Sequence, residues 1–238
     1  MTSVIWEADG PILVVSIDRP TTRNAITEEM ARQIAGALDQ FDESPSLRVA
    51  ILHGLHGNFS SGMDLKRFQE TGKRPLDPRR GGGGIVWSPP RKPIIAAVEG
   101  YALGLGFEMV LACDLVVAAS DAQLGLPEVR HGLVAAGGGA MRLPSRIPKA
   151  VAMEMLLTGR ALPASRLHEL GLINRVVEPR EALAGALVVA KEIADLPTAA
   201  VEFTKELVTI SRDWSESDMF ARQEPKLSKF LAARRASR

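Results

Sequence analysis

The chain has 238 residues, 46% of them hydrophobic and 24% charged, a composition ordinary for a globular protein with a sizeable buried core. Its 29 basic and 28 acidic residues leave a formal net charge of +1, so no overall field would gather nucleic acid or other polyanions. Its apolar stretches fall short of the ~20 residues that a membrane span needs, and no signal-peptide pattern opens it, which predicts a soluble, cytoplasmic protein.

Short apolar runs alternate with segments of helical periodicity in the first half of the chain. The runs that predict buried strands lie at 12–17, 49–52, 94–98 and 115–118. Thr27 is placed to cap a helix that continues through Leu38, and a second helix is predicted over 106–113. Buried strands that alternate with helices predict an α/β fold.

The segment between Lys66 and Pro93 has a different composition. Glycines occupy 81–84 and two prolines follow at 89–90, so regular structure is not expected to persist there. We therefore predict a mobile segment, which could fold over a substrate or be a surface insertion without that role.

After Pro148 the pattern becomes helical. Helical periodicity covers 150–157, 164–170, 180–196 and 198–210, with a short extended link at 172–177. The last third of the chain is therefore predicted to form a helical layer.

Two glycine turns follow predicted strands and could present backbone amides. Gly104-Leu105-Gly106 opens the helix over 106–113, where unpaired N–H groups point outward, and Ser61-Gly62-Met63 could present the Met63 amide. Paired amides suit an oxygen on which negative charge develops, as on a thioester enolate. A purely structural turn is the alternative for Gly104-Leu105-Gly106, whereas a dinucleotide site is disfavoured because Met109 replaces the third glycine.

Two glutamates lie close to these turns in the sequence. Glu108 falls one turn into the predicted helix among apolar neighbours, where a carboxylate is costly to bury, although a first turn also favours glutamate electrostatically. Glu128 follows Leu126-Pro127 and could equally be an exposed loop acid. The glycines at 137–139 are expected to expose further amides near Glu128.

Other chemistries have weak signatures. His53 and His56 form an HxxH pattern without a third ligand cluster, so no metal site is predicted and both are expected at the surface. Ser60 and Ser61 precede Gly62 without the glycine that a hydrolase elbow requires, which disfavours a serine hydrolase.

Taken together, these motifs resemble the crotonase family, also called the enoyl-CoA hydratase/isomerase family. The matching segments, in order, are 17–25, 58–65, 100–108, 122–128, 132–143 and 153–177. The resemblance implies a crotonase-type spiral of ββα units over 1–178 and a helical oligomerisation region over 179–238. Many members of the family are trimers or dimers of trimers, so a homotrimer or hexamer is expected.

The resemblance also implies an activity. A trans-2-enoyl-CoA would bind with its carbonyl oxygen at the Met63 and Leu105 amides, Glu108 would deprotonate water, and Glu128 would protonate the α-carbon to give a 3-hydroxyacyl-CoA. The residues matching the family's CoA-binding surface are Arg23, Asn24, Ala25, Ser61, Asp64, Leu65 and Lys66. Coenzyme A is part of the substrate, and no separate cofactor is implied.

Two departures and two alternatives accompany this interpretation. Ala135-Ala136 stands where hydratases often carry Pro-Gly. The segment after Gln223 is shorter than the family's usual ending and unlike it, and Phe230 and Arg234 would there replace the aromatic and basic residues that close a neighbouring subunit's CoA pocket. Another acyl-CoA reaction, such as isomerisation or dehydration, is the alternative within the family. A non-catalytic acyl-CoA-binding or scaffold protein that uses its basic tail is the alternative from another class.

Overall fold

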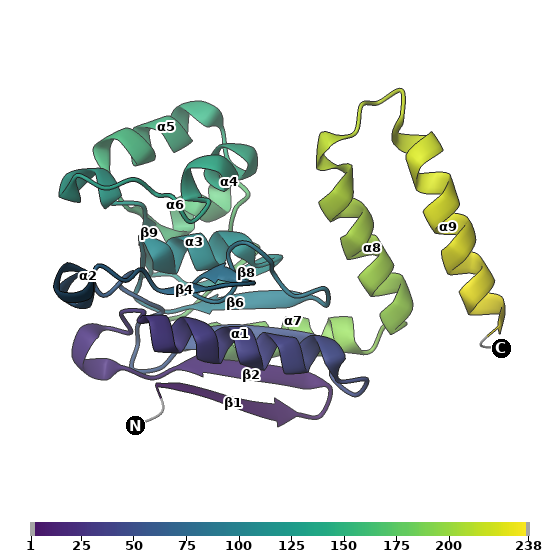
Figure 1. The fold of residues 1–238 in the computed structure, drawn as a ribbon, viewed down its shortest axis with the longest axis horizontal. Helices are drawn as coiled ribbons and strands as arrows, with labels where there is room; N and C mark the ends of the chain where they lie inside the picture. Colours follow the sequence, from purple (N-terminus) through teal and green to yellow (C-terminus); the bar gives the residue numbers. More distant parts are fainter. Residues whose placement is uncertain (1–2, 237–238) are drawn as a thin grey trace. The chain divides into compact units, whose positions relative to one another are not determined.

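A computed structural model describes residues 3–236, which form two compact units divided between Asp195 and Leu196 (Figure 1). The core of the first unit is a sheet in the order β1-β2-β3-β6-β8-β11. These strands are β1 (Val4–Asp9), β2 (Ile12–Ile17), β3 (Val49–Gly54), β6 (Ile94–Val98), β8 (Leu115–Ala119) and β11 (Arg175–Val177). All neighbours are parallel except β1 and β2. The predicted α/β fold and its four apolar strands are confirmed.

Both faces of this sheet are covered by helices. Ala50 and Leu52 of β3 pack into the core shared with α1 (Glu28–Glu43) and α3 (Leu105–Ala112), whereas Val49 and Ile51 pack against α7 (Ala182–Ala194). Side chains of a strand alternate between faces, so a strand that is buried on both sides must be apolar throughout. The predicted cap of α1 is confirmed, because the Met30 amide donates to the Thr27 hydroxyl at 3.3 Å.

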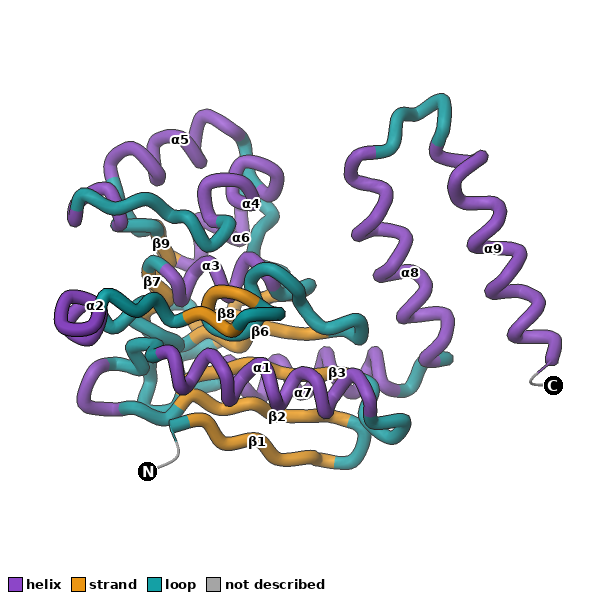
Figure 2. The backbone as a smooth tube through the Cα atoms, in the orientation of Figure 1, coloured by secondary structure: helices purple, strands orange, loops and turns teal. Residues whose placement is uncertain are grey.

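A smaller sheet lies beside α3 and carries the segments of interest for function. It consists of β7 (Tyr101–Leu103), β9 (Gln123–Gly125) and β10 (Leu162–Pro163), with β7 and β9 parallel. Three further helices of the first unit are α4 (Gly139–Arg146), α5 (Lys149–Thr158) and α6 (Ala164–Glu169). α4 packs against α3, and Figure 2 shows α4 and α5 on the same side of the first unit.

The predicted mobility of the segment between Lys66 and Pro93 is wrong for its central part. After α2 (Leu65–Thr71), β4 (Leu76–Asp77) pairs with β5 (Gly81–Gly82), and residues 80–86 are buried. Arg80 holds the segment to α1 through ion pairs with Asp39 at 2.8 Å and Asp42 at 3.0 Å. A methyl group on Gly84 would lie 2.1 Å from the Ala31 carbonyl oxygen, so only glycine allows this approach.

The surface position predicted for His53 is also wrong. His53 lies in β3 at the centre of the sheet, is buried, and hydrogen-bonds the Ser16 hydroxyl at 2.8 Å. His56 is exposed beside Asp18. Across residues 3–236, no cluster of three His, Cys, Asp or Glu side chains is arranged to hold a metal ion.

The second unit is a helical hairpin of α8 (Thr198–Ile210) and α9 (Met219–Ala236), joined through the short helix η3 (Ser211–Asp213). Phe203 and Phe230 stack with ring centroids 4.8 Å apart, and Lys226 pairs with Glu206 at 2.7 Å. The first unit includes α7, which packs on the main sheet, so the division into compact units lies at 195/196, whereas the resemblance places the start of the helical region at 179. No helix within the described part of the chain is long and apolar enough to cross a membrane.

Candidate active site

The two glycine turns singled out in the sequence lie next to each other. Ser60 forms a parallel bridge to Ala102, donates its amide to the Tyr101 carbonyl at 2.9 Å, and accepts the Leu103 amide at 3.0 Å. Gly62 has a φ of 99°, and a methyl group built on it would lie 2.7 Å from the Leu103 carbonyl oxygen and 3.4 Å from the Leu105 nitrogen. Only glycine tolerates this conformation and contact, so the turns converge because residue 62 has no side chain.

The hydrogen bonds around these turns leave the Met63 and Leu105 amides available. Ile26 donates to the Gly62 carbonyl at 2.8 Å and accepts from Asp64 at 3.0 Å, so the intervening Met63 amide points away from Ile26. Leu105 is the first residue of α3, and first-turn N–H groups have no acceptor within their helix. Within residues 3–236, neither amide donates to a protein atom.

Glu108 is buried in the first turn of α3, with 4% of its surface exposed. Its Oε1 accepts the Gly139 amide at 2.9 Å, and the Gly137 amide also donates to the carboxylate. Burial raises the pKa of Glu108, while the two amides and the positive charge of Arg142 act in the opposite direction. The sequence had placed these glycine amides near Glu128, so the structure corrects that expectation: they hold Glu108.

Glu128 opens the short helix η2 (Glu128–His131), where it is half-buried. Its Oε2 is buried and has no hydrogen-bond partner among the described residues. A methyl group on Gly104 would lie 3.3 Å from the other oxygen, Oε1, which places this carboxylate at the start of α3. Burial, helped by the negative charge of Glu108, raises the pKa of Glu128 to about 7.

These contacts bring together four of the residues named from sequence. Glu108 and Glu128 act on each other electrostatically, and the amides of Met63 and Leu105 lie at the same end of α3. A buried and a half-buried carboxylate beside unpaired amides can move protons at a group whose oxygen accepts two hydrogen bonds.

Apart from Arg23, the residues expected to bind CoA fall into two groups. The first group is built into the fold: the buried Asn24 side chain donates to the Leu55 and Asn58 carbonyls at 2.9 and 2.7 Å. The Ala25 carbonyl accepts from Arg19, and the Ser61 hydroxyl donates to the Thr22 carbonyl. The Asn24 and Ser61 side chains and the Ala25 carbonyl shape the turn around Gly62 through these hydrogen bonds.

The second group lies around α2 and at the surface. Asp64 caps α2 through the Arg67 amide at 3.0 Å and pairs with Arg19 at 2.7 Å. Burial raises its pKa, but the Arg67 amide and Arg19 outweigh that effect and leave the pKa lowered. Leu65 and Lys66 are exposed.

Arg23 stands apart because its guanidinium carbon lies 5.7 Å from the centroid of the Tyr101 ring. Its φ of 50° is rare for a residue with a side chain.

Sequence reasoning missed Arg142 and Arg19, whose partners are remote in the sequence.

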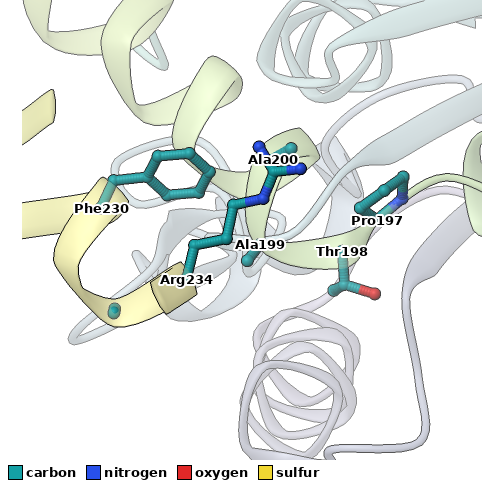
Figure 3. Close-up of a pocket in the computed structure, with 7 residues that line it drawn as sticks. Pro197, Thr198, Ala199, Ala200, Phe230 and Arg234 are labelled. Carbon is teal, nitrogen blue, oxygen red and sulfur yellow. The ribbon is translucent and has the colours of Figure 1, made fainter. Parts of the chain in front are cut away.

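Phe230 and Arg234, suggested from the resemblance, lie within the second unit. They line a pocket of about 420 Å³ together with residues at the start of α8 (Figure 3).

The sequence model described as Enoyl-CoA hydratase/isomerase matches residues 7–234. The chain belongs to this family, the crotonases. An enoyl-CoA hydratase from Mycobacterium tuberculosis H37Rv superposes with a TM-score of 0.90 at 48% identity, covering 94% of this chain and 88% of its own. The predicted family and the crotonase fold are confirmed.

Curated relatives narrow the chemistry within the crotonases. A carnitinyl-CoA dehydratase of Salmonella arizonae is 40% identical over 212 residues, which are 87% of this chain and 80% of the relative. A mevalonyl-coenzyme A hydratase of Aspergillus fumigatus is 40% identical over 198 residues, or 82% and 73% of the two chains. This crotonase therefore has acyl-CoA hydratases and dehydratases as its relatives.

Proposed function

We propose that this crotonase is an enoyl-CoA hydratase, which adds water across the double bond of a trans-2-enoyl-CoA to give a 3-hydroxyacyl-CoA. One observation carries the proposal: Glu108 and Glu128, in different environments, adjoin the unpaired amides of Met63 and Leu105. Relatives named as CoA hydratases and dehydratases support the same chemistry.

The Met63 and Leu105 amides would form an oxyanion hole for the thioester carbonyl. The carbonyl oxygen would accept a hydrogen bond from each amide, and the turns at Gly62 and Gly104 fix both donors in place. The donors stabilise the negative charge that develops when the carbonyl becomes an enolate. The same polarisation makes the β-carbon electrophilic, so water can add there.

The two carboxylates divide the proton transfers. Glu108, as a carboxylate held by two amides, takes a proton from water as the hydroxyl oxygen bonds to the β-carbon. Glu128, whose pKa is about 7, is protonated in a large fraction of molecules at neutral pH and gives its proton to the α-carbon. The product gains one hydroxyl and one hydrogen, and proton exchange with solvent restores both glutamates.

We assign CoA binding to the surface around α2. Arg23 and Lys66 are cations that suit the phosphates of CoA, and the exposed Leu65 offers apolar contact. Asn24, Ala25, Ser61 and Asp64 contribute by shaping the backbone against which the ligand lies. CoA enters as part of the substrate, without a further cofactor.

Self-association is the second part of the proposal. In the first unit, Val134, Met141 and Leu157 are 72%, 74% and 68% exposed, more than is usual for large apolar side chains. A homotrimer or hexamer would cover such residues. Light scattering should show a species of three or six chains, and a fully active monomer would contradict the assembly.

The activity is tested with a panel of trans-2-enoyl-CoA thioesters of different length and branching. Hydration is followed by the loss of enoyl-thioester absorbance and by product identification. We expect turnover of at least one member and none with Glu108→Gln and Glu128→Gln together. Turnover that survives in the double variant, or its absence with every thioester, would refute the proposed function.

A dehydratase acting on a more highly substituted 3-hydroxyacyl-CoA is the second candidate. It is favoured by the relatives named carnitinyl-CoA dehydratase and mevalonyl-CoA hydratase. The same two-glutamate arrangement would run in reverse. Carnitinyl-CoA and a branched 3-hydroxyacyl-CoA belong in the panel, and faster turnover of either than of simple enoyl-CoAs would favour this candidate.

A further inference from the structure

Arg142 connects three parts of the candidate site. Its amide donates to the Gly138 carbonyl at 2.8 Å at the start of α4, and its Nη2 donates to the Val86 carbonyl at 2.6 Å. A methyl group built on Gly138 would lie 2.2 Å from Nη1. The guanidinium therefore packs directly on the backbone of Gly138, which has a φ of 101°.

Gly138 is the middle residue of the turn that holds Glu108. The amides on either side of it, from Gly137 and Gly139, donate to the Glu108 carboxylate. Arg142 ties this turn to Val86, which ends the buried segment 80–86. A shift of the guanidinium would thus reach the two donors of Glu108 through a single glycine.

The charged surroundings of Glu108 are few. α3 packs against β7 and α4. α4 brings Arg142 near the carboxylate and places Arg146 near the Cys113 carbonyl, whereas β7 brings only the exposed phenol of Tyr101. Glu128 faces Glu108 from η2 and carries the like charge. Arg142 is the cation whose charge lowers the pKa of Glu108 against the effect of burial.

We propose that Arg142 is a positioning residue for Glu108, because it fixes the turn at 137–139 and keeps a positive charge beside the carboxylate. This inference rests on the proposed function, in which Glu108 must be ionised to accept a proton from water. Burial favours the neutral acid, so the base needs an opposing influence at neutral pH. Lysine could supply the charge but not the planar fork that reaches Val86 and covers Gly138.

The first test compares pH–rate profiles for Arg142→Met, Arg142→Lys and the control Arg146→Met. Arg146 lies one turn later on α4 and reaches the Cys113 carbonyl at 3.5 Å. In Arg142→Met, the acidic limb of kcat should move up by about one pH unit, the usual effect of losing a nearby opposite charge. KM should change by less than about twofold, since Arg142 acts through Glu108 and does not bind the thioester.

The other variants separate charge from geometry. In Arg142→Lys, the acidic limb should move by no more than about half of the shift seen in Arg142→Met, because the positive charge remains. The kcat plateau should still be lower than in wild type, because lysine lacks the planar fork. Arg146→Met should leave the limb in place. An unmoved limb in folded Arg142→Met, or an equal shift in Arg146→Met, would overturn the inference, and Arg142→Lys decides it if Arg142→Met does not fold.

A second measurement does not depend on turnover. Infrared difference spectra between acid and neutral pH report carboxylic acid bands, and the band lost in Glu108→Gln identifies Glu108. Its titration should move up in pH in Arg142→Met and stay in place in Arg146→Met. An unchanged titration refutes the role of Arg142 whatever the activity, whereas a shifted one in a protein that hydrates no enoyl-CoA refutes only the proposed function.

Discussion

Glu108 and Glu128 belong to one site but occupy opposite environments. Glu108 is held from two sides, with the Gly139 amide 2.9 Å from Oε1 and the Gly137 amide also donating. Glu128 has a buried Oε2 without a partner in the described part of the chain. Hydrogen bonds to a carboxylate favour its charged form, and burial without them favours the neutral acid. The difference teaches that local polarity can favour different charge states in two residues of the same type, which is the basis for the proposed roles of acid and base.

The two groups nevertheless influence each other. The negative charge of Glu108 disfavours ionisation of Glu128 and adds to the effect of burial. At neutral pH one proton shared between them would reside mainly on Glu128, because the amides of Gly137 and Gly139 stabilise the charge of Glu108, whereas Glu128 has only its own backbone amide. That distribution is the one that hydration requires, with a base and an acid present at the same time.

The largest expected effect comes from replacing either Glu108 or Glu128. Glu108→Gln and Glu128→Gln should each lower kcat by about 10²–10⁴-fold, the usual range for a lost general base or acid. The carboxamide keeps the shape and can occupy either environment, so folding and CoA-ester binding should be retained. Stopped-flow hydration assays together with calorimetric titration of an acyl-CoA check both points.

The two variants should also change the pH dependence of the rate in different ways. Glu108→Gln should lose the acidic limb, and Glu128→Gln should lose the fall in kcat/KM that follows as pH rises past about 7. Identical profiles in the two variants would show that the environments do not divide the roles.

The next largest effect is expected at the proposed oxyanion hole, formed by the Met63 and Leu105 amides. Leu105→Pro deletes the amide hydrogen at the first position of α3, where helices accept proline. Loss of one such donor should lower kcat by about 10²–10³-fold. Met63→Leu keeps its amide and is the matched control, with activity expected within about threefold. Normal hydration by folded Leu105→Pro would mean that this turn serves only packing.

The turn at 137–139, which holds Glu108, can be altered without replacing the carboxylate itself. Gly137→Ala would place a methyl group 2.3 Å from Oε2, so the base must move. We expect kcat to fall by roughly 10–100-fold, because small misplacements of reacting groups are costly. Gly36→Ala adds the same methyl group within α1, where nothing lies within 4 Å, and should keep activity. Equal activity in the two variants would show that Glu108 tolerates displacement.

The sequence predicts the central part of this fold because its signals are local. Continuous apolar runs such as 49–52 are typical of strands buried on both faces, and Thr27 followed by apolar residues at helical spacing is sufficient for α1. The segment at 80–86 could not be predicted in this way. Its order depends on Arg80 reaching Asp39 and Asp42, contacts that composition does not reveal.

The candidate site shows the same division between features that follow from local sequence and features that depend on distant contacts. Glu108, Glu128, Met63 and Leu105 could be named from short motifs, and their roles stay predictions. Their environments could not be predicted, because one donor to Glu108 is Gly139, 31 residues away. The guanidinium that covers Gly138 is likewise tied to Val86, 56 residues from Arg142. A contact between the starts of two helices leaves no periodic trace in the sequence.

The smallest expected effect is on stability, and it isolates the burial of Glu128. Its pKa rises from an ordinary value of 4.5 to about 7 on folding, so the folded state binds more protons than the unfolded state between these values. Stability contributed by this group therefore falls as pH rises through that window and is lowest above it. Glu128→Gln removes the titrating group and should be relatively more stable than wild type at alkaline pH.

Urea unfolding at pH 5 and pH 8 measures this cost. The gain in unfolding free energy for Glu128→Gln over wild type should be larger at pH 8 than at pH 5 by about 1–3 kcal/mol. Glu70→Gln, on the exposed surface of α2, should change stability little at either pH. Equal gains at both pH values would show that Glu128 reaches solvent when charged, and its assignment as the acid of the pair would then lose its physical basis.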